Sequence, residues 1–325
     1  MIITRTPVRI SLFGGGTDYP TWLNAGNTGI VFGGAINKYS YITCRYLPPF
    51  NDYYSYLSYS KVETVKANGL IEHNVIRETL SYFNVDEGIE IAHLADIPSK
   101  TGTGSSSTFL VGLINAICTL KGDEVADNEL ARLAIDIEQN YLKESVGYQD
   151  SMWAAFGGFN TITFEGNKFS IYRNKGKAIR DLEKNLMLFF TGIRRRSSDV
   201  ASTYVPSLAQ KEYQQKRTIE LTNEAINYFN ERKFDKIGEL LDTAWSIKKS
   251  ISSNISNGTI DAIYDRAKRA GALGGKVTGA GGGGSLILYV PKEKQKSVAE
   301  ELSDLIRIPF KFTDKGSEVI LKNGE

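Results

Sequence analysis

Three glycine-rich segments, widely separated along the chain, constrain this sequence more than any other feature. They are Phe13–Tyr19 (FGGGTDY), Pro98–Ser107 (PSKTGTGSSS) and Lys276–Ser285 (KVTGAGGGGS). Glycine allows positive φ angles and lets a ligand approach main-chain N–H groups closely. Each segment is therefore a candidate ligand-binding turn, although a single glycine-rich turn is equally common as a simple chain reversal.

The second segment has the features of a phosphate site. Three serines, Ser105, Ser106 and Ser107, follow its glycines, and apolar residues at the spacing of one helical face come next. The first N–H groups of a helix lack partners within the helix, and the helix dipole places partial positive charge at that end. The segment therefore predicts a helix N-terminus whose backbone amides bind phosphate.

The commonest nucleotide-binding signatures do not explain these segments. The sequence has no Gly-Lys-Ser or Gly-Lys-Thr, which a P-loop requires. A formal G-x-G-x-x-G at Gly279–Gly284 runs into a predicted strand instead of opening a helix, which disfavours a nicotinamide oxidoreductase. The HRD and DFG tripeptides of protein kinases are also absent. The chain is glycine-rich like a nucleotide enzyme but follows none of these patterns.

Composition excludes several classes of partner. Lys and Arg (39) nearly balance Asp and Glu (37), so there is no basic excess of the kind that nucleic-acid-binding proteins show. Two cysteines and two histidines are too few for a disulfide framework or a zinc site. No apolar run approaches the ~20 residues of a membrane-spanning helix, and arginines interrupt the N-terminal apolar stretch. We expect a cytoplasmic protein without membrane or nucleic-acid partners.

Hydrophobic periodicity predicts an α+β chain in two domains. Strands are expected at 2–12, 29–36, 39–46, 89–94, 159–164, 169–172, 186–190, 285–290 and 310–312. Helices are expected at 70–83, 106–120, 127–141 (capped by Asp127 or Asn128), 208–229, 234–251, 258–270 and 294–306. A boundary near residue 180 gives domains 1–180 and 181–325. No flexible linker marks it, so the two domains should share an interface.

Together and in this order, the three segments resemble the motifs of the GHMP kinase superfamily, which includes galactokinase, homoserine kinase, mevalonate kinase and phosphomevalonate kinase. The family has an N-terminal basic motif, here from Pro7-Val8-Arg9, a central P-x3-G-x-G-S-S loop and a C-terminal Lys-x-Thr-Gly-Ala-Gly-Gly-Gly motif. The resemblance spans nearly the whole chain. It implies an ATP-binding N-terminal domain (1–180) of the ribosomal S5 domain 2 type and a ferredoxin-like C-terminal domain (181–325).

Within the superfamily, the run Gly14–Asp18 resembles the sugar-1-kinase branch that acts on D-glycero-D-manno-heptose 7-phosphate or fucose. Galactokinases carry Glu-His where this chain has Gly15-Gly16, which argues against galactose. The resemblance implies phosphorylation of the anomeric hydroxyl of a sugar phosphate, first of all the heptose 7-phosphate. The alternatives are a kinase of fucose or another free sugar, and a non-catalytic binding protein on the same fold.

The resemblance also assigns the nucleotide and metal sites. ATP would be bound by the central loop, and Mg²⁺ by Ser106 together with Glu138 from a following helix, since magnesium prefers oxygen ligands. The loop departs from the family pattern at Thr103, where leucine is usual, and at Ser107-Thr108, where alanines are common. The expected ATP-binding residues are Pro98, Lys100, Thr101, Gly102, Thr103, Gly104, Ser105, Ser106 and Ser107.

The catalytic pair implied by the resemblance is Asp150 with Arg9. Asp150, in Val146–Ser151, would accept the proton of the attacking hydroxyl or only orient that hydroxyl. Arg9 would pair with Asp150 and face the transferring phosphoryl group. Without the resemblance, Arg9 would be interpreted as an ordinary salt bridge at a strand end.

The acceptor sugar would contact residues of the first and third segments. Gly16, Thr17 and Asp18 would line its pocket, because a carboxylate can accept two hydroxyl donors, and Gly281 and Gly282 would shape it. At least one arginine of the basic run Arg194–Arg196, first of all Arg194, is a candidate for a bidentate contact to a substrate phosphate, and Lys248 is a weaker candidate. The alternative for this run is a solvated charge cluster. A cluster of tyrosines at 53–59 leaves a homodimer contact open, beside ordinary strand packing.

Overall fold

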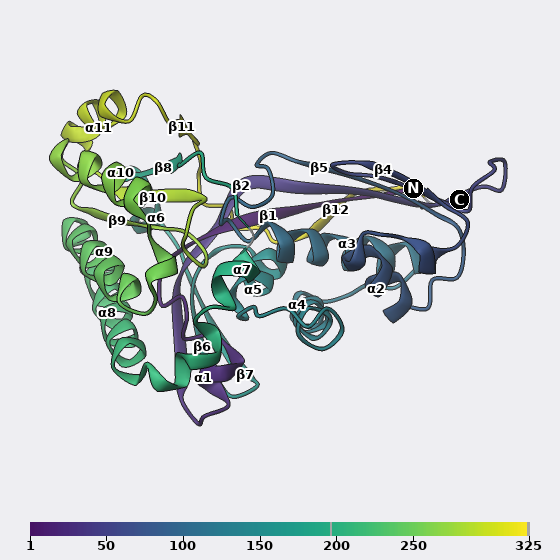
Figure 1. The fold of residues 1–325 in the computed structure, drawn as a ribbon, viewed down its shortest axis with the longest axis horizontal. Helices are drawn as coiled ribbons and strands as arrows, with labels where there is room; N and C mark the ends of the chain where they lie inside the picture. The colour runs from purple at the N-terminus through teal and green to yellow at the C-terminus, as the bar shows by residue number, and fades with distance from the viewer. Residues whose placement is uncertain (196, 324–325) are drawn as a thin grey trace.

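The computed structural model describes residues 1–195 and 197–323. Arg196, part of the predicted phosphate-binding run, lies outside the described residues. The described chain forms two sheets, each with its own helices, and the N-terminal sheet carries the longer strands (Figure 1). None of its helices is both long enough and apolar enough to span a bilayer.

The N-terminal sheet is built around one long strand, β2 (Thr28–Tyr46). The sequence predicts two strands here, but the chain stays extended through Asn37 and Lys38, so one half of β2 pairs with β6 and the other half with β5. The strand order is β12-β1-β2-β5-β3-β4, with β6 and β7 attached through β2. The other strands are β1 (Ile2–Phe13), β3 (Ser55–Ser58), β4 (Val62–Val65), β5 (Ile89–Ala95), β6 (Phe159–Glu165), β7 (Lys168–Asn174) and β12 (Glu318–Lys322).

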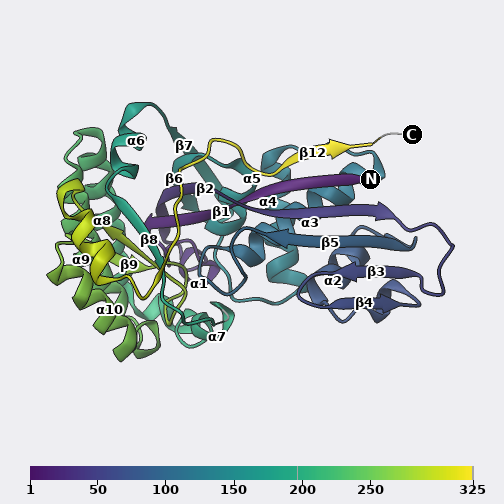
Figure 2. The same cartoon turned by 90° about the horizontal axis from the view of Figure 1, so that it is seen from above.

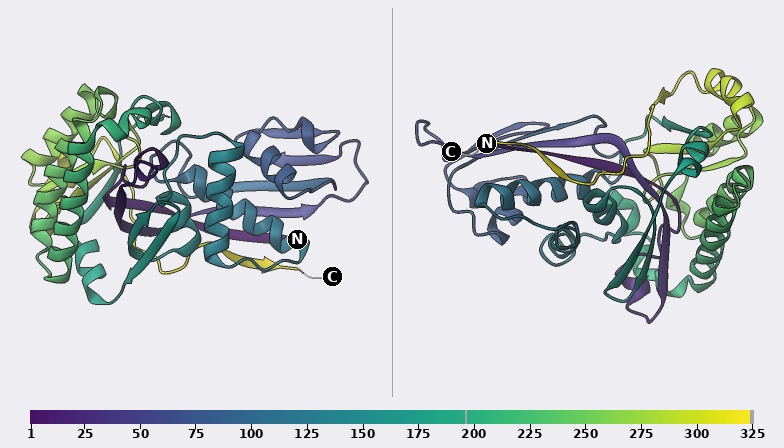
Figure 3. Two further views of the ribbon diagram at one scale, coloured as in Figure 1. Left: turned by 90° about the horizontal axis from the view of Figure 1, so that it is seen from below. Right: turned by 180° about the vertical axis from the view of Figure 1, so that it is seen from behind.

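The helices of this domain pack on one face of the sheet, as Figures 1 and 3 show. They are α2 (Asn74–Tyr82), α3 (Ser105–Lys121), α4 (Asp127–Asp136) and α5 (Gln149–Phe156), with a 3₁₀ turn at Asn68–Leu70. The helix predicted over 127–141 stops being α-helical at Asp136 and continues as a π-helical turn, Ile137–Tyr141. Ala126 occupies its cap position, so the predicted caps Asp127 and Asn128 were wrong by one or two residues.

The C-terminal domain has the predicted ferredoxin-like βαββαβ arrangement, with antiparallel strand order β11-β8-β10-β9. Its strands are β8 (Leu186–Phe190), β9 (Gly274–Val277), β10 (Ser285–Tyr289) and β11 (Ile306–Arg307). Its main helices are α8 (Glu212–Asn230), α9 (Phe234–Lys249), α10 (Gly258–Arg269) and α11 (Gln295–Glu301). The remaining elements of the described chain, from both domains, are short helices and 3₁₀ turns: α1 (Pro20–Leu23), α6 (Lys177–Glu183), α7 (Ser197–Ala201), Val205–Gln210, Ser253–Ile255 and Lys292–Lys294.

The two domains share a continuous hydrophobic core, as the missing linker predicts. Side chains of β1, including Ile10 and Leu12, pack in one cluster with Leu188 of β8, Leu221 of α8 and Ile287 of β10. Burial on this scale fixes the domains against each other.

The chain end differs from the prediction. Of the strand expected at 310–312, only Phe312 makes an isolated bridge, to Ile36. The last strand, β12, returns to the N-terminal sheet and pairs antiparallel with β1, so both termini lie at the same end of the molecule (Figure 2). A boundary at 180 therefore assigns these last residues to the wrong domain. Pairing with β12 covers the edge of β1, which would otherwise expose its backbone groups.

Candidate active site

Arg9 and Asp150 form a bidentate ion pair between the sheet and α5. Arg9 Nε lies 2.7 Å from Asp150 Oδ1, and Nη2 lies 2.6 Å from Oδ2. The register of β1 against β2 shifts between Pro7 and Arg9, an irregularity of the kind that redirects side chains near active sites. The Arg9 side chain is buried, whereas 23% of the Asp150 side chain is exposed. The carboxylate thus remains accessible to a further hydrogen-bond donor.

The central glycine loop lies against this pair. The third guanidinium nitrogen of Arg9, Nη1, donates to the carbonyl oxygen of Gly102 at 2.7 Å. Gly104 precedes the first residue of the 17-residue helix α3 at φ +75°, a conformation that disfavours other residues. A Cβ atom there would lie 3.2 Å from Arg9 Nε and from Asp150 Oδ2. The N-terminus of α3 therefore opens beside the Arg9–Asp150 pair, as a phosphate site requires.

The third glycine segment packs backbone to backbone on the central loop. Ser285 N donates to the carbonyl oxygen of Thr101 at 2.9 Å, and a Cβ at Gly284 would lie 2.6 Å from the same oxygen. Gly281 is buried, and a Cβ there would lie 2.7 Å from the carbonyl oxygen of Ile255. Gly281 thus packs closely against Ile255, and its substrate contact stays a prediction. Gly282 is half-buried near the side chain of Arg195.

Glu138 is a buried carboxyl group held by two hydroxyls. Its Oε1 accepts from Ser107 Oγ at 2.5 Å and its Oε2 from Ser151 Oγ at 2.9 Å, and burial raises the pKa of Glu138 to about 8. The expected partner Ser106 is instead exposed. Consecutive helical residues point about 100° apart, so only one of these serines can face Glu138. The π-helical turn that carries Glu138 is a feature often found at functional sites.

The donors around Glu138 suit magnesium. They are all oxygens, which Mg²⁺ prefers, and a buried carboxyl with a raised pKa lacks a cationic partner. Within the described residues, no group of three or more His, Cys, Asp and Glu side chains could hold a metal by itself. A Mg²⁺ ion here would therefore complete its coordination with phosphate oxygens and water, as it usually does.

Asp18, which the sequence predicts as a sugar ligand, faces the protein interior in the structure. Its Oδ1 accepts from Gly16 N at 3.1 Å and from Gln149 Nε2 at 2.9 Å, and its Oδ2 accepts from Gln149 N at 3.0 Å. The side chain is fully buried, and burial raises the pKa of Asp18 to about 6. Asp18 thus ties the first glycine loop to the start of α5, directly before Asp150. No sequence signal singled out Gln149.

Thr17 and Gly16 are also engaged within the protein. The Thr17 hydroxyl donates toward the carbonyls of Gly14 and Ile30 and accepts from Ile30 N at 3.0 Å. Gln215 of α8 donates to the carbonyl oxygen of Gly16 at 2.8 Å. The first segment therefore folds inward because its backbone and side chains bond to β2, α5 and α8.

Several cations lie near the loops. Arg194, the predicted phosphate ligand, is exposed and makes no hydrogen bond or ion pair within the described residues. Its neighbour Arg195 is half-buried against the third segment. Lys276, the lysine of the third motif, is buried and donates to the carbonyl oxygen of Leu12 at 3.0 Å. Burial, and next the charge of Arg9, lowers the pKa of Lys276 to about 7.

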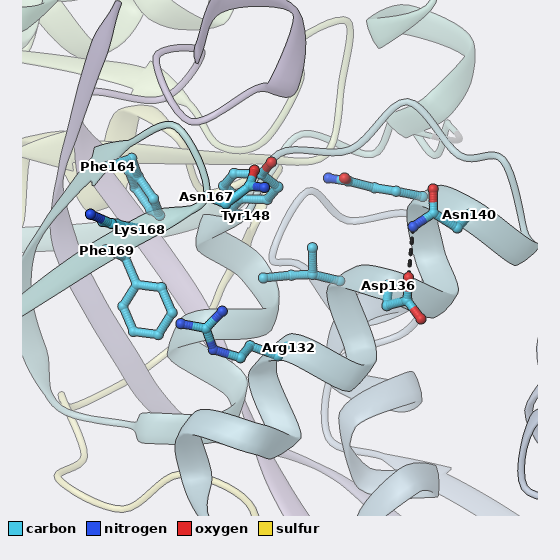
Figure 4. A pocket seen from close by; sticks show the side chains of 10 residues that line it. Arg132, Asp136, Asn140, Tyr148, Phe164, Asn167, Lys168 and Phe169 are labelled. Atoms are coloured by element: carbon cyan, nitrogen blue, oxygen red, sulfur yellow. Dashed lines mark hydrogen bonds between the residues drawn. The ribbon is translucent and has the colours of Figure 1, made fainter. Parts of the chain in front are cut away.

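A cavity of about 290 Å³ lies beside α4 (Figure 4). Its walls come from α4, the π-helical turn and the β6–β7 hairpin, and Tyr148, two residues before Asp150, is one of them. Figure 4 shows Arg132 and Phe169 on its wall, with the guanidinium 5.2 Å from the ring centroid. The Arg9–Asp150 pair does not line it.

Two family models match the chain, one in each domain. Residues 68–158 match the model of the GHMP kinases N terminal domain, and residues 225–307 match that of the GHMP kinases C terminal domain. The D-glycero-alpha-D-manno-heptose 7-phosphate kinase of Campylobacter jejuni is 30% identical over 317 residues, covering 93% of each chain. The mevalonate kinase of Methanocaldococcus jannaschii is 29% identical over 247 residues, covering 70% of each.

Among solved structures, a D-glycero-D-manno-heptose 1-phosphate kinase from Bacteroides thetaiotaomicron superposes with a TM-score of 0.78. The superposition covers 100% of both chains at 22% sequence identity. At this identity the likeness concerns the fold, which matches over its whole length.

Proposed function

Because the chain belongs to the GHMP kinase family, we propose that it phosphorylates the anomeric hydroxyl of a sugar phosphate, D-glycero-D-manno-heptose 7-phosphate. Phosphotransferase activity with ATP as donor follows from the family itself. The choice of acceptor is supported by the Campylobacter jejuni heptose 7-phosphate kinase, which aligns over nearly the whole chain. It is also supported by Gly15-Gly16, which replace the Glu-His of galactokinases.

The observation that carries this proposal is the Arg9–Asp150 pair at the N-terminus of α3. Phosphoryl transfer requires mainly positioning and neutralisation of charge. In the proposed mechanism, Asp150 accepts a hydrogen bond from the attacking hydroxyl through its exposed edge and so orients it. Arg9 holds Asp150 from its buried side, and the backbone amides at the start of α3 bind the donor phosphates.

Glu138, with the hydroxyls of Ser106 and Ser107 at the start of α3, is the proposed site of Mg²⁺. The bound ion supplies positive charge to the phosphate oxygens. The protein's own contribution is to keep the Glu138 carboxyl buried and hydrogen-bonded to Ser107 and Ser151, so that its orientation is fixed before the ion binds.

A coupled ADP-release assay with Mg-ATP and a panel of sugars and sugar phosphates tests the proposal. Wild-type protein should turn over the heptose 7-phosphate. Asp150→Asn should lose at least ~100-fold in kcat, as expected for removal of a general base or an orienting group. Asp123→Asn, in an exposed turn, is the matched control and should keep full activity. Turnover of free fucose, with none of any sugar phosphate, would show that the acceptor is a free sugar. An Asp150→Asn variant as fast as wild type would reject the assigned site.

A further inference from the structure

Two cations contact the backbone of the third glycine segment without an acidic partner. Lys248 reaches it from α9, and Arg195 reaches it from the loop after β8. Neither lies within 4 Å of an Asp or Glu oxygen in the described part of the chain, whereas Arg9 and Lys249 each pair with an Asp.

Lys248 is directed at the start of this segment. Its Nζ donates to the carbonyl oxygen of Gly279 at 2.5 Å and to that of Val277 at 3.2 Å. The next residue, Lys249, is also half-buried but pairs with Asp261 at 3.1 Å. Burial, followed by the positive charges of Lys276 and Arg195, lowers the pKa of Lys248 well below its usual range. Its ammonium group therefore lies where further negative charge would stabilise it.

Arg195 lies at the other end of the same segment. Its Nη2 is 3.5 Å from the carbonyl oxygen of Gly283, its Nη1 is 3.3 Å from Ser197 Oγ, and its Nε is buried with no hydrogen-bond partner within the described residues. Burial lowers the pKa of Arg195. A buried guanidinium N–H without an acceptor is costly, so the position calls for a ligand that accepts hydrogen bonds.

The surrounding charge is positive. Arg9 is matched by Asp150, but Lys276, Lys248 and Arg195 have no acid within ion-pair distance among the described residues. Partly buried cations that repel each other destabilise a protein unless a ligand anion compensates. Dianionic phosphate is such a ligand, and arginine and lysine are the side chains that recognise it.

We propose that Arg195 and Lys248 form a phosphoryl-binding site on the Gly279–Gly284 loop. This site takes the phosphate of the acceptor and is separate from the phosphate loop at the start of α3, which takes the phosphates of ATP. The inference deepens the proposed function, on which it rests. It also moves the phosphate contact from Arg194, which is exposed, to Arg195, which touches the loop.

Steady-state kinetics of Lys248→Met and Arg195→Met test this assignment. We expect KM for the sugar phosphate to rise roughly 10- to 100-fold, as for loss of a charge-assisted phosphate contact. KM for ATP should change less than ~3-fold, because the donor phosphates bind at α3. Lys249→Met and Arg194→Met are the matched controls and should stay within ~3-fold of wild type. Arg195→Lys should recover part of the loss, since it keeps the charge.

A rise in KM for ATP with an unchanged KM for the sugar phosphate would overturn the assignment to the acceptor. Equal losses in Lys248→Met and Lys249→Met would overturn the site itself. Circular dichroism and thermal melting of each variant separate these outcomes from misfolding.

Calorimetric titration with inorganic phosphate, in the presence of Mg²⁺ and a non-hydrolysable ATP analogue, gives a readout that does not depend on turnover. Wild type and Lys249→Met should bind phosphate, and Lys248→Met should bind it at least ~10-fold more weakly. If wild-type protein turns over no sugar phosphate, the proposed function fails while this titration still tests the site. Equal phosphate affinity in all three proteins would overturn the inference.

Discussion

The guanidinium group of Arg9 bonds the carboxylate of Asp150 through two parallel hydrogen bonds, 2.7 and 2.6 Å long, although the residues are 141 positions apart in the chain. The third nitrogen of the same group bonds the central glycine loop through the carbonyl of Gly102. One side chain thus joins the carboxylate assigned to the acceptor and the loop assigned to ATP. This arrangement yields a direct prediction.

Arg9→Lys should lower kcat by roughly 100-fold, because lysine keeps the charge but cannot make both bonds to Asp150 and the bond to Gly102 together. KM for ATP should change much less. Arg5→Lys is the control, since Arg5 lies on the same strand and pairs with Glu318 away from the loops. Comparable kcat values for Arg9→Lys and wild type would show that the geometry of the pair is not needed for catalysis.

Alanine substitutions at two glycines with nearly equal φ distinguish the cost of backbone strain from the cost of a steric clash. Gly14 has φ +84° and Gly26 has φ +82°, but a Cβ at Gly14 would lie 1.9 Å from the carbonyl oxygen of Ile30, whereas one at Gly26 would meet nothing within 4 Å. Gly26→Ala should lower the free energy of unfolding by about 1–2 kcal/mol, the cost of the left-handed conformation. Gly14→Ala should cost roughly 3 kcal/mol or more, because overpacking adds to that strain.

Urea denaturation of both variants measures this difference. If Gly14→Ala and Gly26→Ala are equally stable, the first glycine loop does not pack against β2 as described.

Asp18 should make the stability of the protein depend on pH in an unusual direction. Burial raises its pKa from 3.8 to about 6, so between these values the folded state binds more protons than the unfolded state. The contribution of Asp18 to the free energy of unfolding therefore falls as pH rises from about 4 to about 6, by up to roughly 3 kcal/mol. The fall is complete about one unit above the folded-state pKa, and the contribution is constant from about pH 7.

Asp18→Asn removes this titration, so the difference in unfolding free energy between wild type and variant, measured at intervals from pH 4 to pH 7, should change across that window. A difference that does not vary with pH would contradict the buried position of Asp18. Subtracting the unfolding free energy of Asp18→Asn from that of wild type cancels the titrations of other carboxyl groups, such as Glu318, whose pKa is lowered.

The serines at the start of α3 should differ in their effect on magnesium. Ser107→Ala removes a hydrogen bond to Glu138, so the Mg²⁺ concentration for half-maximal activity should rise about 10- to 100-fold. Ser105→Ala should leave it unchanged. If Ser106→Ala alone shifts the Mg²⁺ requirement, the ligand expected from the motif is the right one, and Ser107 only fixes Glu138.

The sequence was most informative where local signals and motif order agree. The serines and apolar spacing after the central loop predicted α3 to within one residue at each end, and motif order placed Arg9 and Asp150 in one site. The α3 prediction succeeds because a helix N-terminus, its glycines and its hydrophobic face are encoded within a few adjacent residues. The pairing of Arg9 with Asp150 came from the family resemblance and from no local pattern.

The features that the sequence did not predict depend on contacts that no local pattern encodes. Asp18 lies in the predicted loop, but its inward direction depends on Gln149, far along the chain. The choice between Ser106 and Ser107 depends on the rotation of α3 relative to Glu138. The pairing of β12 with β1 joins opposite ends of the sequence. The residues of one short strand do not indicate which other strand it pairs with.

The most direct test of the central claim is to follow the reaction of Mg-ATP with D-glycero-D-manno-heptose 7-phosphate by ³¹P NMR, with wild-type protein and with Asp150→Asn. We predict a new anomeric phosphate resonance that grows in step with ADP in the wild-type reaction and at least ~100-fold more slowly in the variant. ADP formation without an anomeric phosphate, or equal rates for the two proteins, would contradict the account.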